Sequence, residues 1–209
     1  MPSVRLFFMI FLPLTLLFGM SPLARAQGGE ATWQVQKVLD RAMEIQTDPA
    51  LAGEENRQER ARLIRQLIAD NFLSQTMAKK SLENHWGALS ASQRNAFQDV
   101  FITLFQDSYT RMVLNFLVEE DVRYGEEEIP LGEARKVQTT IMRVSEHIPV
   151  DYTLHREGGR WFITDVEIDG VSIVNNYRNS FNRVIQASSF NDLLERMKAQ
   201  KEAIMADQI

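Results

Sequence analysis

The sequence has 209 residues, of which 44% are hydrophobic and 24% charged, and its formal net charge at pH 7 is −5. These fractions match an average globular protein and exclude a disordered chain, a collagen or a polytopic membrane protein. The absence of cysteine excludes disulfide bonds, thiolate nucleophiles and iron–sulfur ligation. The three histidines, His85, His147 and His155, lack the spacing of a zinc site. We therefore expect no bound metal and no cofactor.

The first 26 residues have the parts of a secretory signal peptide. Arg5 precedes an apolar run over residues 6–18, and Ala24 and Ala26 are small residues at the positions that a signal peptidase reads. The apolar run is too short to cross a bilayer comfortably as a stop-transfer helix. We therefore expect cleavage after Ala26 and export of the remaining chain.

Residues 27–209 are expected to form a single soluble domain, since domains usually have ~100–200 residues. Removal of Arg5 and Arg25 with the signal peptide changes the net charge from −5 to −7. An acidic protein is poorly suited to nucleic acid, because affinity for phosphates depends largely on lysine and arginine. It is equally unsuited to electrostatic docking on an anionic membrane. Nucleic acid is therefore excluded as a partner.

The first half of the chain has helical periodicity. Apolar side chains recur at helical spacing from Trp33 to Met43 and again from Leu63 to Met77, and Asp48-Pro49 separates the two stretches. Residues Ser90 to Gln93 form a capping box, which predicts that the longest helix begins there and continues to about Leu117. One face of this helix is rich in aromatic residues.

The period then changes to the alternation of strands. Apolar and polar side chains alternate at residues 122–124, 137–142 and 148–155. Gly158-Gly159 predicts a tight hairpin turn into a further strand over residues 161–168, since glycine supplies the positive φ that such turns need. The sequence therefore predicts three or four antiparallel strands.

The helical period returns after Asp169-Gly170, with one helix containing Tyr177 and Phe181 and a last helix from about Phe190. Helices thus precede and follow the strands in the chain. This order is typical of an α+β fold, in which an antiparallel sheet of about four strands packs against N-terminal and C-terminal helices.

Residues 161–181, which read WFITDVEIDGVSIVNNYRNSF, resemble the signature of the MlaC-like periplasmic phospholipid-binding proteins. This group is also called the toluene-tolerance auxiliary family of an ABC lipid transport system. The resemblance extends upstream through residues 149–152 and His85-Trp86, and downstream to Leu193-Leu194. It covers most of the chain between residues 72 and 197.

Two local departures from the family pattern are visible. A glycine that the family often carries near Glu83 is absent, and Ala187 to Ser189 replaces a turn that usually contains glycine. Both departures concern local backbone geometry. Neither changes the class of ligand that the resemblance implies.

The resemblance implies a periplasmic carrier that binds a phospholipid by its acyl chains. Such a carrier exchanges lipid between an outer-membrane lipoprotein complex and an inner-membrane ABC transporter with an MCE-type subunit, and so maintains the lipid asymmetry of the outer membrane. The implied fold is a curved antiparallel sheet, similar to the nuclear-transport-factor-like cone, that encloses an apolar slot against the helices. We expect a monomer without enzymatic activity.

The slot is expected to lie between the aromatic face of the long helix, the apolar face of the sheet and the helix that follows the sheet. Its expected lipid-binding residues are Phe97, Phe101, Leu104, Phe105, Tyr109, Met112, Val113, Val150, Tyr152, Trp161, Val166, Val171, Ile173, Tyr177 and Phe181.

An enzymatic alternative uses Asp165 and Tyr152. With a two-residue turn at Gly158-Gly159, Tyr152 faces Asp165 on the apolar side of the sheet. A carboxyl group in that position, with its pKa raised by burial, suits a general base for proton transfer. The opposing interpretation is a glycine bulge that shifts the register by one residue, turning Asp165 outward and Val166 inward.

A third alternative is an adaptor whose apolar faces dock to partner helices without binding lipid. The acidic runs Glu119 to Asp121 and Glu126 to Glu128 are compatible with solvated turns and with a charged docking surface. A carrier purifies with lipid, an enzyme converts an isolated substrate, and an adaptor does neither.

Overall fold

A computed structural model describes residues 29–117, 120–130 and 132–206. The expected signal peptide lies outside the described residues. The helices, in chain order, are α1 Glu30–Thr47, the 3₁₀ turn Pro49–Leu51, α2 Arg57–Asn71, α3 Ser74–Leu82, the 3₁₀ turn Glu83–Ala88, α4 Ala91–Phe116, α5 Ile173–Ala187 and α6 Phe190–Ala206.

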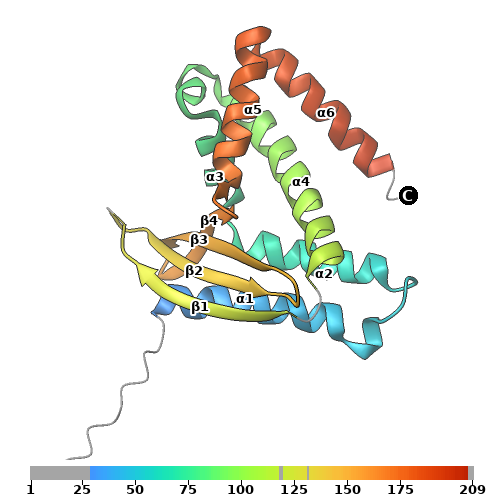
Figure 1. The fold of residues 1–209 in the computed structure, drawn as a ribbon. Coiled ribbons are helices and arrows are strands. Elements are labelled where there is room, and N and C mark those ends of the chain that lie inside the picture. The colour runs from blue at the N-terminus through green and yellow to red at the C-terminus, as the bar shows by residue number, and fades with distance from the viewer. Residues whose placement is uncertain (1–28, 118–119, 131, 207–209) are drawn as a thin grey trace, which may run out of the picture.

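The strands form one antiparallel sheet in the order β1-β2-β3-β4-β5 (Figure 1). The sheet is open and curved, and the α+β class is confirmed. It has five strands where about four were expected, because a two-residue strand follows the last predicted one. The strands are β1 Asp121–Glu128, β2 Arg135–Met142, β3 His147–Glu157, β4 Arg160–Ile168 and β5 Val171–Ser172.

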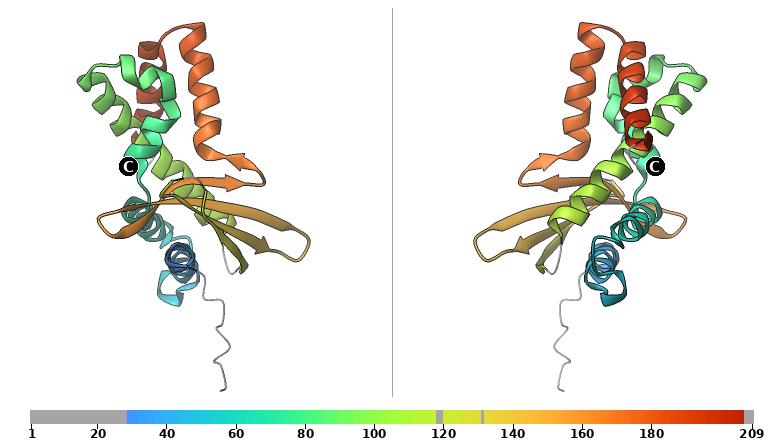
Figure 2. Two further views of the ribbon diagram at one scale, coloured as in Figure 1. Left: turned by 90° about the vertical axis from the view of Figure 1, so that its left-hand side faces the viewer. Right: turned by 90° about the vertical axis from the view of Figure 1, so that its right-hand side faces the viewer.

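The helices divide into two groups around the sheet. Helices α1 and α2 lie across one face of it, whereas α3, α5, α6 and the first half of α4 stand together at one end (Figures 1 and 2). The second half of α4 runs down to the sheet, beside α2 (Figure 1). Within the described ranges, no helix is long and apolar enough to cross a membrane.

Helix α4 begins where the capping box predicted. The Ser90 hydroxyl accepts the N–H of Gln93 at 3.2 Å, and the Gln93 side chain accepts the N–H of Ser90 at 3.0 Å. At its other end α4 has no glycine cap. Its last carbonyls accept hydrogen bonds from the Gln46 side chain of α1, at 3.0 Å to Val113 and 2.7 Å to Leu117. The end of α4 is therefore held by a residue of another helix.

The β3–β4 hairpin contains both a tight glycine turn and a bulge. Gly158 and Gly159 have φ values of 57° and 81°, which suit a two-residue turn, and Leu154 pairs with Ile163 as expected. The register then shifts by one residue, so Tyr152 pairs with Val166 and not with Asp165. The pairing of Tyr152 with Asp165 that the enzymatic alternative assumed is therefore wrong, and the opposing interpretation, a register shift of one residue that turns Asp165 away from the face of Tyr152, is confirmed. The bulge lies within β4 and not at the glycines.

Candidate functional site

An apolar cavity of about 340 Å³ lies between the sheet, α1, α2 and the second half of α4. This volume is near the lower end of ~300–1,000 Å³, the usual range for small-molecule pockets. The sheet contributes the side chains that point toward α1 and α2, which include Val150, Tyr152 and Val166. Helices α1 and α2 close the opposite side through Val35, Leu39, Ile64 and Ile68, among others.

The cavity wall is almost entirely hydrocarbon. Tyr109 and Tyr152 add two phenols, and burial raises the pKa of both above its ordinary value, so both hydroxyls remain neutral at physiological pH. A largely apolar cavity of this size favours alkyl chains over polar solutes, since each buried methylene contributes about 0.8 kcal/mol.

The mouth of the cavity lies where α4 ends and β2 turns into β3. Phe116, the last residue of α4, is 61% exposed, and Ile141 pairs with Ile148 on the adjoining strands. Arg143 stands beside them and donates hydrogen bonds to the Phe116 carbonyl and, at 3.1 Å, to the Glu120 carboxylate. The mouth therefore combines apolar side chains with one guanidinium group.

The structure brings together seven of the expected lipid-binding residues in the cavity wall. Three lie on the second half of α4, and four lie on the sheet or at the start of α5. They are Tyr109, Met112, Val113, Val150, Tyr152, Val166 and Ile173.

Five other expected residues form an aromatic cluster outside the cavity wall. Phe97 and Phe101 on the first half of α4 pack against Tyr177 and Phe181 of α5. Phe105, one turn further along α4, stacks on Phe101 and contacts Phe72 and Tyr109, which line the cavity. The ring centroids of Phe101 and Tyr177 are 5.2 Å apart, and those of Phe97 and Phe181 are 5.6 Å apart. The aromatic face of α4 therefore has two roles, because the part up to Phe105 forms core and the part from Tyr109 onward lines the cavity.

The remaining three expected residues also lie outside the cavity wall. Leu104 is buried in the hydrophobic core, and Val171 on β5 is 59% exposed. The Trp161 indole N–H donates to Glu30 at 3.3 Å, and the guanidinium groups of Arg135 and Arg156 lie over its ring. Trp161 is thus held near the start of α1 by polar contacts.

Much of the cavity wall consists of residues that the sequence argument had not assigned to the slot. Most of them belong to α1, α2 and the outer ends of the strands. The sequence did contain a signal for the α2 wall. Ile64, Leu67 and Ile68 form an apolar stripe along α2, and such a stripe packs against another apolar surface. The additional wall residues are Val35, Val38, Leu39, Ala42, Ile64, Leu67, Ile68, Phe72, Phe116, Leu117, Ile141, Arg143, Ile148, Ile163 and Ile168.

Asp165 and Tyr152 do not form the pair that the enzymatic alternative requires. Asp165 pairs across the sheet with Thr153, one position from Tyr152, and neighbouring residues of a strand point to opposite faces. Its carboxylate accepts the N–H groups of Val166 at 2.9 Å and Val174 at 3.1 Å. Asp165 therefore acts as a structural acceptor that links β4 to the beginning of α5.

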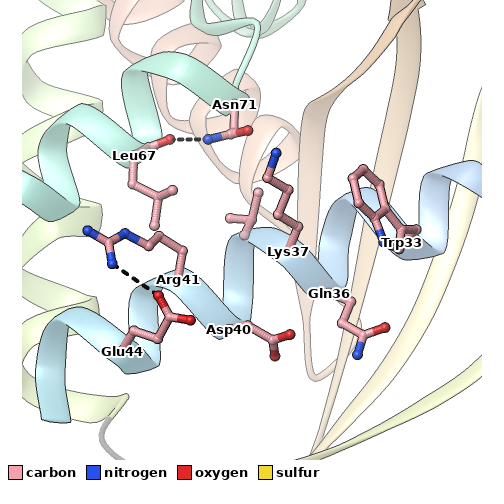
Figure 3. A pocket seen from close by; sticks show the side chains of 9 residues that line it. Trp33, Gln36, Lys37, Asp40, Arg41, Glu44, Leu67 and Asn71 are labelled. Carbon is pink, nitrogen blue, oxygen red and sulfur yellow. Dashed lines mark hydrogen bonds and ion pairs between the residues drawn. The ribbon is translucent and has the colours of Figure 1, made fainter. Parts of the chain in front are cut away.

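A second groove lies on the outer side of α1 and has a different character (Figure 3). Its volume is about 460 Å³, and its lining mixes the charged side chains of Lys37, Asp40, Arg41 and Glu44 with apolar ones such as Trp33 and Leu67. Arg41 and Glu44 point toward each other there and form an ion pair at 3.0 Å. Within the described part of the chain, four charged groups in this groove contrast with the single one in the wall of the apolar cavity, so the groove is the less suitable site for a lipid chain.

The model of the MlaC protein family matches residues 36–199, which is well over half of the chain. The chain belongs to the MlaC protein family. The matched range contains the signature at residues 161–181 and the cavity walls of the sheet, α2 and α4. The sequence resemblance to this family is therefore confirmed. No curated protein matches the sequence.

The fold of this MlaC family member is also found in a solved structure, the phospholipid-binding protein from Ralstonia solanacearum in complex with a phospholipid. The TM-score is 0.71 at 21% sequence identity, and the match covers 84% of this chain and 99% of that chain. At this identity the similarity establishes the fold.

Proposed function

We propose that this protein is a periplasmic carrier that binds a phospholipid by its acyl chains. The observation that carries the proposal is an apolar cavity with an arginine at its mouth, in a member of the MlaC family. The similarly folded Ralstonia solanacearum protein was solved with a phospholipid bound, which supports the same class of ligand.

The energetics of tail burial favour transfer of the lipid over permanent capture. At about 0.8 kcal/mol per methylene, some ~30 methylenes represent roughly 24 kcal/mol of transfer free energy. A bilayer offers the same chains nearly the same stabilisation. The carrier and the membrane are therefore close to balanced, and net direction must come from the partners.

The proposed partners are an outer-membrane lipoprotein complex and an inner-membrane ABC transporter with an MCE-type subunit. Exchange between them places the protein in a route that maintains the lipid asymmetry of the outer membrane. The carrier itself is proposed to be a monomer that holds the lipid and performs no chemistry.

Native mass spectrometry of the protein purified from its periplasmic fraction tests the proposal. We expect a mass increment of about one phospholipid per chain, and the same lipid after extraction with organic solvent. A spectrum of apoprotein alone, with no extractable lipid, would refute the carrier function. Such a result would favour the adaptor alternative.

A further inference from the structure

Among the described residues that line the cavity, Arg143 is the only charged one. Its side chain is 28% exposed and lies at the mouth, between the end of α4 and the β2–β3 turn. Leaving a charge beside an apolar cavity costs free energy unless the charge has partners. The half-buried Glu120 carboxylate, 3.1 Å from Nε, offsets part of this cost, and the face of the guanidinium group that Glu120 does not contact remains beside the opening.

The guanidinium group is oriented by the protein without being saturated by the contacts described. Nε donates to Glu120 at 3.1 Å, and Nη2 donates to the Phe116 carbonyl. Nη1 forms a longer ion pair with the exposed Glu146 carboxylate at 3.8 Å, a distance at which no hydrogen bond is made. An arginine has five N–H donors, so two hydrogen bonds hold the group while others remain for a ligand.

The position of Arg143 matches the place where a bound lipid would carry its phosphate, and this step rests on the proposed function. In a diacyl phospholipid only the glycerol separates the acyl chains from the phosphate. With the chains inside the cavity, the phosphate emerges at the mouth. We infer that Arg143 binds the phosphodiester of the lipid and so selects phosphate-bearing lipids from neutral diacyl lipids.

Arginine suits this task because its planar fork matches two phosphate oxygens at once. The phosphodiester is common to zwitterionic and anionic glycerophospholipids. Recognition at Arg143 therefore selects the class of lipid without distinguishing its headgroups. Diacylglycerol has the same chains and lacks the phosphate, so it isolates the contribution of Arg143.

The test compares phosphatidylglycerol and diacylglycerol with identical chains, each displacing a fluorescent phospholipid from delipidated protein. We expect the wild type to prefer phosphatidylglycerol by roughly tenfold or more, as for a charge-assisted contact. Arg143→Gln should lose this preference and keep its affinity for diacylglycerol. Arg62→Gln, which removes an exposed arginine of α2 outside the cavity wall, should behave like the wild type.

An unchanged preference in Arg143→Gln overturns the inference while leaving the carrier function intact. A wild-type protein that binds neither lipid refutes the carrier function itself. If Arg143→Gln fails to fold, Arg143→Lys replaces it, because lysine keeps the charge and lacks the planar guanidinium group. Its preference for phosphatidylglycerol over diacylglycerol should fall to an intermediate value. An undiminished preference in Arg143→Lys would then overturn the inference.

A final displacement measurement distinguishes two possible ligands of Arg143, the phosphate of a bound lipid and a free phosphate compound. Glycerol phosphate should fail to displace the fluorescent phospholipid from the wild type, because the tails supply most of the binding free energy. Displacement by glycerol phosphate alone would identify a free-phosphate site and overturn the assignment to the headgroup.

Discussion

The Ser172 hydroxyl donates a hydrogen bond of 2.5 Å to the Asp165 carboxylate, and the same hydroxyl accepts the N–H of Asn175 in the first turn of α5. Together with the N–H groups of Val166 and Val174, this makes Asp165 the acceptor of three hydrogen bonds. A single carboxylate therefore fixes both the residue after the β4 bulge and the start of α5.

Asp165→Asn is expected to destabilise the protein by about 1–3 kcal/mol, since an amide leaves part of this donor set unpaired. The folded fraction should still carry lipid, because Asp165 lies outside the cavity wall. Urea unfolding and native mass spectrometry measure the two effects. Asp169→Asn, in an exposed turn with φ of 49°, is the matched control and should leave stability unchanged. A stable Asp165→Asn variant without lipid would contradict this structural role.

Val150→Trp is expected to remove bound lipid, because Val150 lies in the cavity wall and a tryptophan would occupy space that the chains need. Overpacking of this kind costs about 1–3 kcal/mol of stability, so circular dichroism must accompany the lipid measurement. Val144→Trp, at a fully exposed position in the β2–β3 turn, is the matched control and should retain lipid. Full lipid occupancy in a folded Val150→Trp variant would place the ligand elsewhere.

Tail burial should dominate affinity. Exchanging one glycerophospholipid headgroup for another at constant chain length is expected to change affinity far less than removal of one acyl chain, because the chains supply nearly all of the apolar area. Displacement titrations with a headgroup series and with a single-chain lipid measure both effects. Strong discrimination between zwitterionic and anionic headgroups would point to a further polar contact outside Arg143.

Glu83→Gly is expected to stabilise the protein by about 1 kcal/mol. Glu83 follows α3 with a φ of 43° and a ψ of −110°, a conformation that costs a residue with a Cβ about 1–3 kcal/mol. The unfolded chain has more conformational entropy with glycine at this position, which offsets part of the gain. The ion pair of Glu83 with Arg178, at 3.4 Å on the surface, contributes little to the free energy of unfolding.

Glu83→Ala separates strain from charge, because it removes the carboxylate and keeps the Cβ. We expect its melting temperature to be no higher than that of the wild type. If Glu83→Gly melts below Glu83→Ala, the backbone strain at this position is negligible. The sequence comparison had already singled out this place as one where the family often carries glycine.

Tyr124→Phe is expected to make stability less sensitive to alkaline pH. Burial raises the Tyr124 pKa to about 12, with a smaller contribution from Asp40, against 10.0 when unfolded. The folded state thus holds the proton more strongly, and its stability is present below pH 10 and lost as the pH rises toward 12. Urea unfolding across this range should show a smaller loss in the variant.

At neutral pH, Tyr124→Phe should cost no stability. The Tyr124 hydroxyl is buried and has no hydrogen-bond partner among the described residues. Removing an unpaired buried hydroxyl relieves a desolvation cost. Equal alkaline losses in wild type and variant would show that the phenol titrates normally, and they would contradict the burial argument.

Local sequence signals predicted the fold well where one interaction decides the outcome. Ser90 and Gln93 cap α4 as expected, and the Gly158-Gly159 turn aligns Leu154 with Ile163. The register beyond Ile163 was not predictable in the same way. A bulge depends on how the whole sheet packs. The residue types of β4 contain no signal that predicts where the bulge lies.

The candidate site was predictable in its chemistry and only partly in its residues. Tyr109 and Phe101 lie on the same apolar face of α4, yet Tyr109 lines the cavity and Phe101 packs against Tyr177. The difference depends on where α5 crosses α4, which is a tertiary relationship. The same holds for Leu39 and Ile68, whose periodicity indicated burial without indicating what they cover.

The end of α4 is capped by side chains that belong to the other walls of the mouth. Gln46 of α1 and Arg143 after β2 both donate to carbonyls of its final residues, from Val113 to Leu117. The final turn therefore cannot unwind alone, because unwinding breaks contacts to α1 and to the sheet simultaneously. The rim of the opening is therefore cross-linked at one helical turn, so a change at Gln46 in α1 alters the position of the α4 terminus as directly as a change within α4 itself.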